Sequence, residues 1–442
     1  MTTAEVPSRS KHARYVLTPW SVQGGDPPEI VRGSGALLFG ADGKRYLDLS
    51  SGLVAVNLGH GHPTLVEAIA RQAARLCYVA PSLANDERSE FAAELSALAP
   101  WADGCRTFFG TGGGEANEDA IKIARLLTGR SKVLSAFRSF HGSAPGAGSL
   151  TGENRRWPVE PGIPGVVHFF APFPYRSPFH TDDAATETER ALAHLDLVLT
   201  YEDPGRVAAL LIEPVVGSNG VIVYPDGYLH GLRERCDRHG ILLIFDEVMT
   251  GFGRTGAAFA SQRFGVTPDL ITFAKGSTSA YVPLGGVLVP ERIAATFDHQ
   301  QLPAGHTFSG HPLAMAVGRA ALRAYAEGDL FARARTIEGW MRASLGRVRD
   351  RLPIVGDVRG IGAFFAVELV RDRATREPLV PWQGPGAGPL PALQRRLLEL
   401  GAYVFGRYNV LIVAPPLVIE KDELDEGVAI LERGIAELAA SC

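Results

Sequence analysis

The sequence predicts an α/β fold with a mostly parallel central sheet in a large domain, completed by a smaller α+β domain. Short runs that are apolar at almost every position, separated by amphipathic stretches, indicate the large domain. Such runs are typical of strands covered on both faces, and the stretches between them are typical of crossover helices. After about residue 330 the pattern changes to alternation and helical spacing, which indicates the second domain.

The chain is expected to divide into three parts. Residues 1–60 contain a hairpin over 36–49 and contribute to the small domain and the active site. Residues 61–330 form the large domain, and residues 331–442 form the small C-terminal domain. The strands expected in the large domain are CRTFF (105–109), VLSAF (133–137), VAALLI (207–212), ILLIF (241–245) and LITFA (270–274).

Composition and charge exclude several classes of partner. With 442 residues, 46% of them hydrophobic, and a formal net charge of -4, the chain is typical of a globular protein with a large core. So small a charge gives no reason to expect nucleic acid or a membrane surface as a partner. The polar start is not a secretory signal, and no apolar run approaches the roughly 18 to 20 residues that a spanning helix needs.

The cysteines and histidines give no sign of a disulfide framework or a metal site. The cysteines lie far apart, at Cys77, Cys105, Cys236 and Cys442. This spacing fits a reducing, cytoplasmic location best. His60 and His62 have a metal-like spacing, but no third ligand is evident, so no metal is expected.

Three ionisable residues follow predicted strands. Glu213 comes after VAALLI, Asp246 after ILLIF and Lys275 after LITFA. Open α/β sheets bind ligands just beyond the carboxyl ends of their strands, so two acids and one base on neighbouring strands favour a common site. The alternative is that each residue is simply the first solvated position after a strand.

A glycine turn is the second element of the predicted site. Gly112, Gly113 and Gly114 follow the first of these strands and precede a helix with apolar residues at helical spacing. Bare backbone amides at a helix start can hold a phosphate, although glycine clusters also form ordinary turns. No Gly-Lys-Ser/Thr follows, so the turn is not a Walker-type loop.

The stretch GFGRTG at 251–256 raises an alternative, because it matches a dinucleotide-binding pattern. DEVMT separates it from the preceding strand, however, and the residues after it make a poor helix. The acidic residue at about the right distance is Asp269, at the start of the next strand. A chance match in a loop is therefore the preferred interpretation.

A phosphate cradle, a strand-end aspartate and a strand-end lysine together suggest pyridoxal 5'-phosphate. In this interpretation Lys275 forms an imine, or Schiff base, with the cofactor aldehyde. Asp246 keeps the pyridine nitrogen protonated, so that the ring can accept electrons. To act as a nucleophile Lys275 needs a lowered pKa, which burial beside a cationic ring would provide.

Motifs spread over nearly the whole chain carry a family resemblance. They are SGLVAVNLGHGHP (51–63), GTGGGEANEDAIKIAR (110–125), SFHG (139–142), IEPVVGSNGVIV (212–223), LLIFDEVMTGFGRTG (242–256), PDLITFAKG (268–276), HTFSGHPLA (306–314) and APPLVI (414–419). With them the chain resembles the class III (omega) aminotransferases, pyridoxal-phosphate enzymes of fold type I, and especially their taurine:pyruvate and amine:pyruvate branch. GFGRTG is part of this pattern, which removes the dinucleotide interpretation.

The resemblance implies how the cofactor is held. The strand-end lysine and aspartate keep the roles given above. Val248 presses against one face of the ring, and Phe140, in place of the family's usual tyrosine, stacks on the other. The amides of Gly113 and Gly114 hold the phosphate, without the hydroxyl contact that the family's usual Ser-Gly-Ser provides.

Three further residues are implied to lie near the cofactor. Thr307 matches the threonine that reaches the phosphate of the neighbouring subunit, so a homodimer is expected. Glu213 matches a glutamate near the cofactor and the arginine switch, with a purely structural acid as the alternative. His141 is expected near the edge of the cofactor.

On the substrate side the resemblance implies another three residues. Trp20 matches an aromatic residue that lines the pocket in amine and taurine transaminases, with a buried structural tryptophan as the alternative. Val54 stands where many relatives have tryptophan, which predicts a roomier pocket and a bulkier amine. Arg407 resembles the arginine that binds the acceptor's carboxylate and swings aside for an uncharged group, with a solvated surface arginine as the alternative.

The expected function is that of an aminotransferase. It would move an amino group from a primary amine, such as a bulky amine or an omega-amino acid, to a keto acid such as pyruvate or 2-oxoglutarate, with Lys275 transferring the proton. An aminomutase, racemase or decarboxylase of the same family would use the same lysine. From other classes, a nicotinamide-dependent oxidoreductase and a catalytically silent protein of this fold remain as alternatives.

Overall fold

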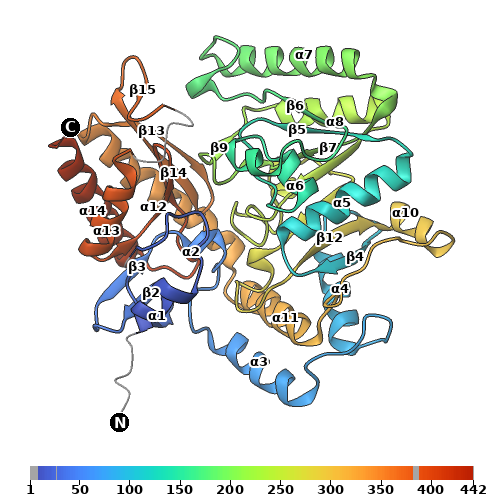
Figure 1. The fold of residues 1–442 in the computed structure, drawn as a ribbon, viewed down its shortest axis with the longest axis horizontal. Coiled ribbons are helices and arrows are strands. Elements are labelled where there is room, and N and C mark those ends of the chain that lie inside the picture. Colours follow the sequence, from blue (N-terminus) through green and yellow to red (C-terminus); the bar gives the residue numbers. More distant parts are fainter. Residues whose placement is uncertain (1–7, 26, 382–387, 442) are drawn as a thin grey trace.

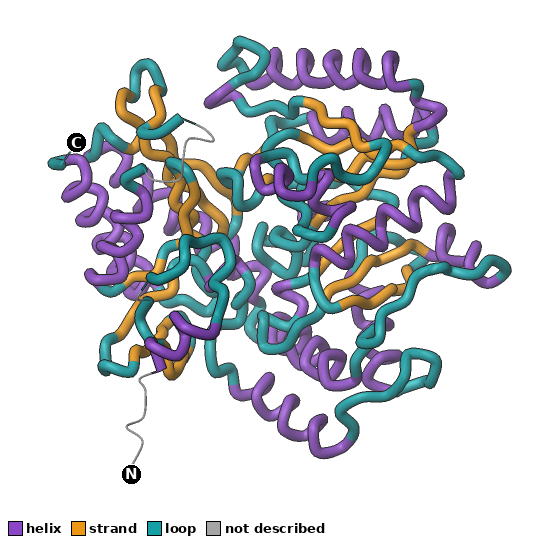
Figure 2. Tube along the Cα trace, viewed as in Figure 1, coloured by secondary structure: helices purple, strands orange, loops and turns teal. Residues whose placement is uncertain are grey.

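Two lobes make up the structure, a computed structural model that describes residues 8–25, 27–381 and 388–441. One lobe is built around a long central sheet with helices on both faces, and the other combines segments from both ends of the chain (Figures 1 and 2). Helix α1 (Ser8–Tyr15) and helix α14 (Lys421–Ala439), near the two ends of the chain, both lie in the smaller lobe (Figure 1).

A seven-stranded sheet forms the core of the larger lobe. Its strands are β4 (Cys105–Gly110), β5 (Lys132–Ala136), β6 (Val166–Phe169), β7 (Val207–Ile212), β10 (Leu242–Asp246), β11 (Leu270–Phe273) and β12 (Gly285–Pro290). They lie in the order β4-β12-β11-β10-β7-β5-β6. The strands from β11 to β6 are parallel to their neighbours, whereas β12 runs antiparallel to β11 and β4.

The strands expected from the apolar runs are all present, and their ends differ from the expected ones by no more than one residue. β6 and β12 were not expected. β12 begins with two glycines, which interrupt the apolar pattern expected of a strand. Glycine is needed at both positions, because a side chain there would collide with the neighbouring backbone. A Cβ on Gly285 would lie 2.6 Å from the carbonyl carbon of Gly112, and one on Gly286 would lie 2.6 Å from the oxygen of Phe108.

Helices cover both faces of this sheet. Alternate residues of β7 point to opposite sides: Ala209 and Leu211 pack with α5 (Gly113–Thr128), whereas Leu210 and Ile212 pack with α7 (Ala184–Glu202) and α8 (Tyr228–His239). All six residues of β7 are buried, which explains why the strand reads as one continuous apolar run. The remaining elements of this lobe are α4 (Asp86–Leu98), α6 (Pro145–Leu150), β8 (Val215–Val216), β9 (Ile222–Val223), α9 (Ala260–Phe264) and α10 (Glu291–Ala294).

The smaller lobe joins the two ends of the chain through a shared sheet. β3 (Arg45–Asp48) pairs in parallel with β16 (Ala402–Tyr403), so the predicted N-terminal hairpin does pack with the C-terminal part. The other strands of the lobe are β1 (Ile30–Ser34), β2 (Leu37–Gly40), β13 (Val355–Ile361), β14 (Phe364–Asp372), β15 (Glu377–Pro378), β17 (Phe405–Arg407) and β18 (Val410–Val413). Its helices are α1 (Ser8–Tyr15), α2 (Ser51–Val54), α12 (Leu330–Arg351), α13 (Leu390–Leu400) and α14 (Lys421–Ala439).

Two long helices lead from one lobe to the other. α3 (Pro63–Arg75) follows the N-terminal segment, and α11 (Pro312–Glu327), which packs against both α3 and α4, runs into α12. In the part of the chain that the structure describes, no helix combines the length and apolar character needed to cross a membrane.

The GFGRTG stretch links the lobes through a fully buried arginine. Arg254 Nη1 donates to the carbonyls of Ala363 (2.9 Å) and Pro415 (2.7 Å), and Nη2 donates to Asn57 Oδ1 (2.5 Å) and Ser51 Oγ (3.2 Å). Burial lowers the pKa of Arg254 to about 10. The stretch is therefore a structural turn that bonds to the N-terminal and C-terminal segments, and no dinucleotide-binding helix begins there.

We expect Arg254→Met to destabilise the protein by on the order of 3 kcal/mol, because it leaves several buried acceptors without a donor. The midpoint of thermal unfolding measures the effect. Arg263→Met is the matched control, since Arg263 is partly exposed and its ion pair with Glu338 is 3.5 Å long. Equal midpoints for the two variants would contradict the role of Arg254.

Candidate active site

The three strand-end residues meet at one edge of the sheet. Glu213 directly follows β7, Asp246 ends β10, and Lys275 follows β11 after one residue. The order β11-β10-β7 makes these strands direct neighbours. Because all three strands are parallel, their carboxyl ends lie at the same edge, so the prediction that these strands are neighbours is confirmed.

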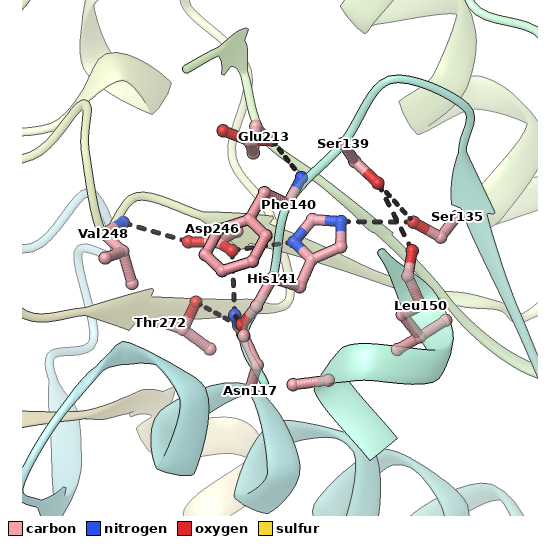
Figure 3. A network of polar contacts seen from close by, with 12 residues as sticks. Asn117, Ser135, Ser139, Phe140, His141, Leu150, Glu213, Asp246, Val248 and Thr272 are labelled. Carbon is pink, nitrogen blue, oxygen red and sulfur yellow. Dashed lines mark hydrogen bonds and ion pairs between the residues drawn. The ribbon is translucent and has the colours of Figure 1, made fainter. Parts of the chain in front are cut away.

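The carboxylate of Asp246 is only 4% exposed and has three partners (Figure 3). Its Oδ2 lies 2.7 Å from His141 Nδ1 and accepts a hydrogen bond of 2.8 Å from Asn117 Nδ2. Its Oδ1 accepts a longer hydrogen bond, 3.1 Å, from the backbone N–H of Val248. His141 was expected at this site, whereas Asn117 was not.

The hydrogen on His141 can be placed from its neighbours. An ionised carboxylate only accepts, so the ring carries its hydrogen on Nδ1, toward Asp246. Nε2 lies 3.1 Å from the hydroxyl oxygen of Ser135, which lies 3.3 Å from the hydroxyl oxygen of Ser139 (Figure 3). The imidazole therefore supports Asp246 as an oriented donor.

Lys275 has an unusual backbone conformation and a lowered pKa. Its φ is 43°, a left-handed conformation that is costly for a residue with a side chain and that is often found at functional sites. Burial lowers the pKa of Lys275 to about 8, although Asp246 and Glu213 act in the opposite direction. Among the described residues Nζ has no hydrogen-bond or ion-pair partner.

The glycine turn presents backbone amides in front of open space. Gly112 precedes α5, and a Cβ built on it would meet no atom within 4 Å. Gly113 is required for a different reason, since its Cβ would lie 2.7 Å from Val248 Cγ2. The N–H groups of Gly113 and Gly114, in the first turn of a 16-residue helix, form a site suited to an anion.

Phe140 and Val248 both lie beside Asp246 (Figure 3). The loop of Phe140 is fixed by Glu213, whose Oε1 accepts from the N–H of Phe140 (2.9 Å) and whose Oε2 accepts from Gly217 (2.8 Å). Burial raises the pKa of Glu213 to about 7, and the nearby Asp246 acts in the same direction. The described contacts of Glu213 are thus those of a structural acid, which was the alternative interpretation.

Two arginines share one buried carboxylate next to Phe140. Arg155 and Arg407 both pair with Glu153, Arg407 at 2.6 Å. Arg407 Nη2 also donates to Asn154 Oδ1 at 2.6 Å. With a side chain only 18% exposed, Arg407 is not a solvated surface arginine.

Sequence reasoning missed Arg155. Its guanidinium lies 3.7 Å from the centre of the Phe140 ring, and it donates to Ser218 Oγ at 2.8 Å. The run Glu153-Asn154-Arg155-Arg156 lies outside the quoted motifs, and only the fold brings it to the SFHG loop.

Trp20 lies beside Phe140 and Arg155. Its ring meets that of Phe140 edge-on at 6.0 Å between centroids, and Arg155 lies 5.6 Å from the Trp20 ring. Trp20 is 64% exposed, so it is not a buried structural tryptophan. The structure thus brings Trp20, Phe140 and Arg155 together, and Arg407 is joined to Arg155 through Glu153.

Val54 does not line open space. Its side chain is 1% exposed and belongs to an apolar cluster with Ile361, Phe364 and Ile412. The small side chain is therefore enclosed by the small lobe, and the expectation that Val54 gives a roomier pocket for a bulkier amine has no support in its position. The neighbouring Leu53 is 54% exposed instead.

Thr307 lies on the exposed loop before α11. Its carbonyl accepts a hydrogen bond from Tyr78 Oη at 3.0 Å. The described residues contain no hydrogen bond between Thr307 and Lys275 or Asp246. The role of Thr307 at the phosphate of a neighbouring subunit stays a prediction.

His60 and the cysteines form neither a metal site nor a disulfide among the described residues. His60 Nε2 lies 2.9 Å from Asp48 Oδ2. No group of three or more potential ligands able to hold a metal occurs among the described residues. Three cysteines are free thiols, and Cys442 lies outside the described residues.

The chain matches a protein family over most of its length. The family model "Aminotransferase class-III" covers residues 23–435. A probable aminotransferase of Mycobacterium tuberculosis is 40% identical over 412 residues, which cover 90% of this chain and 87% of the relative. An omega-aminotransferase of Caulobacter vibrioides is 36% identical over 431 residues, with 93% and 94% covered.

Solved structures show the same fold. A taurine:2-oxoglutarate aminotransferase from Bifidobacterium kashiwanohense, in complex with pyridoxal phosphate and glutamate, is 42% identical and superposes with a TM-score of 0.95, covering 99% of both chains. An amine transaminase from an uncultivated Pseudomonas species, also with pyridoxal phosphate bound, is 34% identical with a TM-score of 0.91, covering 96% of this chain and 98% of the other.

The lowered pKa of Lys275 predicts which lysine reacts with an aldehyde and at what pH. Treating the apoprotein with pyridoxal phosphate and then borohydride should label Lys275 first, because the neutral amine is the nucleophile. The initial rate should rise through about pH 8, where Lys275 loses its proton, rather than near the usual lysine value. Peptide mapping by mass spectrometry identifies the site. Preferential labelling of another lysine, or a rate that rises only near pH 10, would be the opposite result.

Proposed function

Since the chain belongs to the class-III aminotransferases and is a pyridoxal-phosphate-dependent transaminase, we propose that its donor is a short amine with an anionic group at the far end, such as taurine, and that its acceptor is 2-oxoglutarate. The observation that carries the substrate class is the position of Arg155, a cation in contact with the Phe140 ring. The name of the taurine:2-oxoglutarate relative supports the same choice.

The residues present fit the cofactor. When bound, pyridoxal phosphate supplies an aldehyde and a ring that withdraws electrons from the substrate. The amides of Gly113 and Gly114 would hold its phosphate, and Asp246 would accept a hydrogen bond from its protonated ring nitrogen. Val248 and Phe140 would lie against the two faces of the ring, since both lie beside Asp246 (Figure 3).

Lys275 carries the proton transfer. With a pKa of about 8 its amine is partly neutral near physiological pH, so Nζ can take a proton from the substrate carbon that bears the nitrogen and deliver it again. Burial holds this pKa down, whereas a solvated lysine would be almost entirely protonated at the same pH and could not accept the proton. Asp246 accepts hydrogen bonds from three donors, and its fixed negative charge lies opposite the positive charge of the protonated ring nitrogen.

The arginine pair determines which substrates fit. Two guanidinium groups share the single carboxylate of Glu153, which leaves one positive charge unbalanced in a largely buried place. Burial lowers the pKa of Arg155, as expected for a cation whose charge is incompletely compensated. A sulfonate or carboxylate on the substrate supplies the missing negative charge.

One cationic site has to serve two substrates in turn. Taurine has a single acidic group, and 2-oxoglutarate has two. Arg155 is fixed by Ser218 and by the ring of Phe140. It therefore binds an acidic group in each half-reaction, the sulfonate of taurine or one carboxylate of 2-oxoglutarate. Arg407 is bound to Asn154 and Glu153 through one terminal nitrogen, and it exchanges these partners for the second carboxylate of the acceptor.

We also propose that the enzyme acts in the cytoplasm as a homodimer. The loop of Thr307 is exposed and lies beside the exposed ring of Phe308, which contacts Tyr78 at 6.1 Å between centroids. Exposed apolar rings around a polar residue are typical of an interface between subunits. The free thiols of Cys77, Cys105 and Cys236 fit a reducing compartment.

We expect Arg155→Met to lower kcat/KM for taurine about 10- to 100-fold, the loss typical of a hydrogen bond to a charged group. With propylamine, which lacks the acidic group, kcat/KM should change less than threefold. Arg156→Met is the matched control, because Arg156 points away to Glu160 (3.0 Å). Steady-state rates with 2-oxoglutarate as acceptor provide the measurement. A taurine-to-propylamine ratio that is unchanged by Arg155→Met, or no taurine activity in the wild type, would refute the proposed substrate.

Subunit mixing tests the proposed role of Thr307. Lys275→Ala and Thr307→Asp should each abolish activity as homodimers. If Thr307 acts in the neighbouring site, a mixed dimer has one site with both defects and one intact site, so a random mixture recovers about a quarter of the wild-type activity. No recovery after demonstrated subunit exchange would mean that Thr307 acts within its own chain.

A further inference from the structure

The side chain of Asn117 uses all of its polar atoms at the centre of the site. It projects from α5 and is 1% exposed. Nδ2 donates to the carbonyl of His141 at 2.7 Å and to Asp246 Oδ2 at 2.8 Å, while Oδ1 accepts from the hydroxyl of Thr272 at 2.7 Å (Figure 3). Helix α5, the SFHG loop and strands β10 and β11 thus converge on one amide.

These contacts fix the orientation of the amide. With the nitrogen and oxygen exchanged, Oδ1 would face two acceptors, the carbonyl of His141 and the carboxylate of Asp246, at less than 3 Å. Such an arrangement is repulsive, so only the observed orientation is compatible with the site. The hydroxyl of Thr272 adds the one donor that Oδ1 needs, and it thereby favours this orientation further.

The amide in turn sets the orientation of the carboxylate. Asp246 Oδ2 has two donors, Asn117 and His141, whereas Oδ1 has only the longer hydrogen bond from Val248. Rotation of the carboxylate would break two short hydrogen bonds in a buried site. Oδ1 is consequently the oxygen that keeps a lone pair available for a further donor.

The same residue connects both ends of the cofactor site. Asn117 is in the second turn of the helix whose first turn carries Gly113 and Gly114. A hydrogen bond from Asn117 to Asp246 therefore fixes the amides at the start of α5 relative to the carboxylate at the end of β10. A rigid ligand with a phosphate at one end and a ring nitrogen at the other requires such a fixed separation.

We propose that Asn117, oriented by Thr272, is a positioning residue that aims Asp246 Oδ1 at the ring nitrogen of pyridoxal phosphate and fixes its separation from the phosphate-binding amides. The inference rests on the cofactor-binding roles proposed above for Asp246 and the glycine turn. It adds a buried polar contact, between Asn117 and Thr272, that touches neither cofactor nor substrate but determines how the cofactor is held.

Substitutions of Thr272 test this positioning with little change of shape. Thr272→Val keeps the volume and removes the hydroxyl, while Thr272→Ser keeps the hydroxyl. Asn117→Leu removes the whole amide at similar size. Thr250→Val is the matched control, because Thr250 is equally buried and its hydroxyl donates to another carboxylate, Glu247 Oε2, at 3.0 Å.

Two readouts are taken without any amine substrate. The first is the Kd of the apoenzyme for pyridoxal phosphate, from titration of the visible absorption. We expect it to rise about 10-fold in Thr272→Val and more in Asn117→Leu, and to stay within threefold of wild type in Thr272→Ser and Thr250→Val. The second is the pH at which the visible band of the bound cofactor changes. This pH should be higher in Thr272→Val and Asn117→Leu. When Asp246 is less well aligned, the ring nitrogen carries less positive charge, and it therefore repels the proton on the Lys275 nitrogen less.

The outcomes separate the inference from the proposed function. Wild-type affinity and an unmoved spectral transition in Thr272→Val overturn the positioning role, as does an equal effect in Thr250→Val. If Asn117→Leu does not fold, the Thr272 pair decides by the same two readouts. Failure of taurine as a donor, with these readouts as expected, overturns the substrate proposal alone.

Discussion

The carboxylate of Asp246 lies almost completely out of solvent at the end of β10, and a buried charge of this kind is tolerated only where hydrogen bonds replace the water it has lost. Three N–H groups, from Asn117, His141 and Val248, do so. Each comes from a different part of the chain: helix α5, the SFHG loop and the turn after β10. The rest of the site depends on this arrangement, because it fixes a negative charge near Lys275 while the carboxylate and the amine are both buried.

Around this centre the balance of charge explains the chemistry. Burial lowers the pKa of Lys275 most, and Arg155 and Arg254 add to this effect, whereas Asp246 and Glu213 raise the pKa. Two carboxylates act on Lys275, whereas near Phe140 positive charge is in excess, because two arginines pair with the one carboxylate of Glu153. The proposed substrate, with an amine at one end and an acid at the other, matches both sides.

Much of this was accessible to sequence reasoning. The apolar runs located the strands with carboxyl-end residues Glu213, Asp246 and Lys275, because parallel strands buried on both faces have little freedom in composition. β12 escaped detection, since close approach to β4 required glycines in place of the usual branched residues. His141 was expected at the site through its place in SFHG, but its partner Asn117 was not, because an asparagine within a helical pattern carries no signal of its own.

The sequence by itself predicted the fold class, the family and the cofactor, since a lysine, an aspartate and bare amides at strand and helix ends are local features. Only the tertiary structure decided what surrounds them. It brought Arg155 to Phe140 and Trp20, placed Val54 in the core, and oriented Asn117 through Thr272. The physical reason is that these roles are set by contacts between segments far apart in the chain, and neither periodicity nor spacing along the sequence encodes the direction in which a side chain finds its partner.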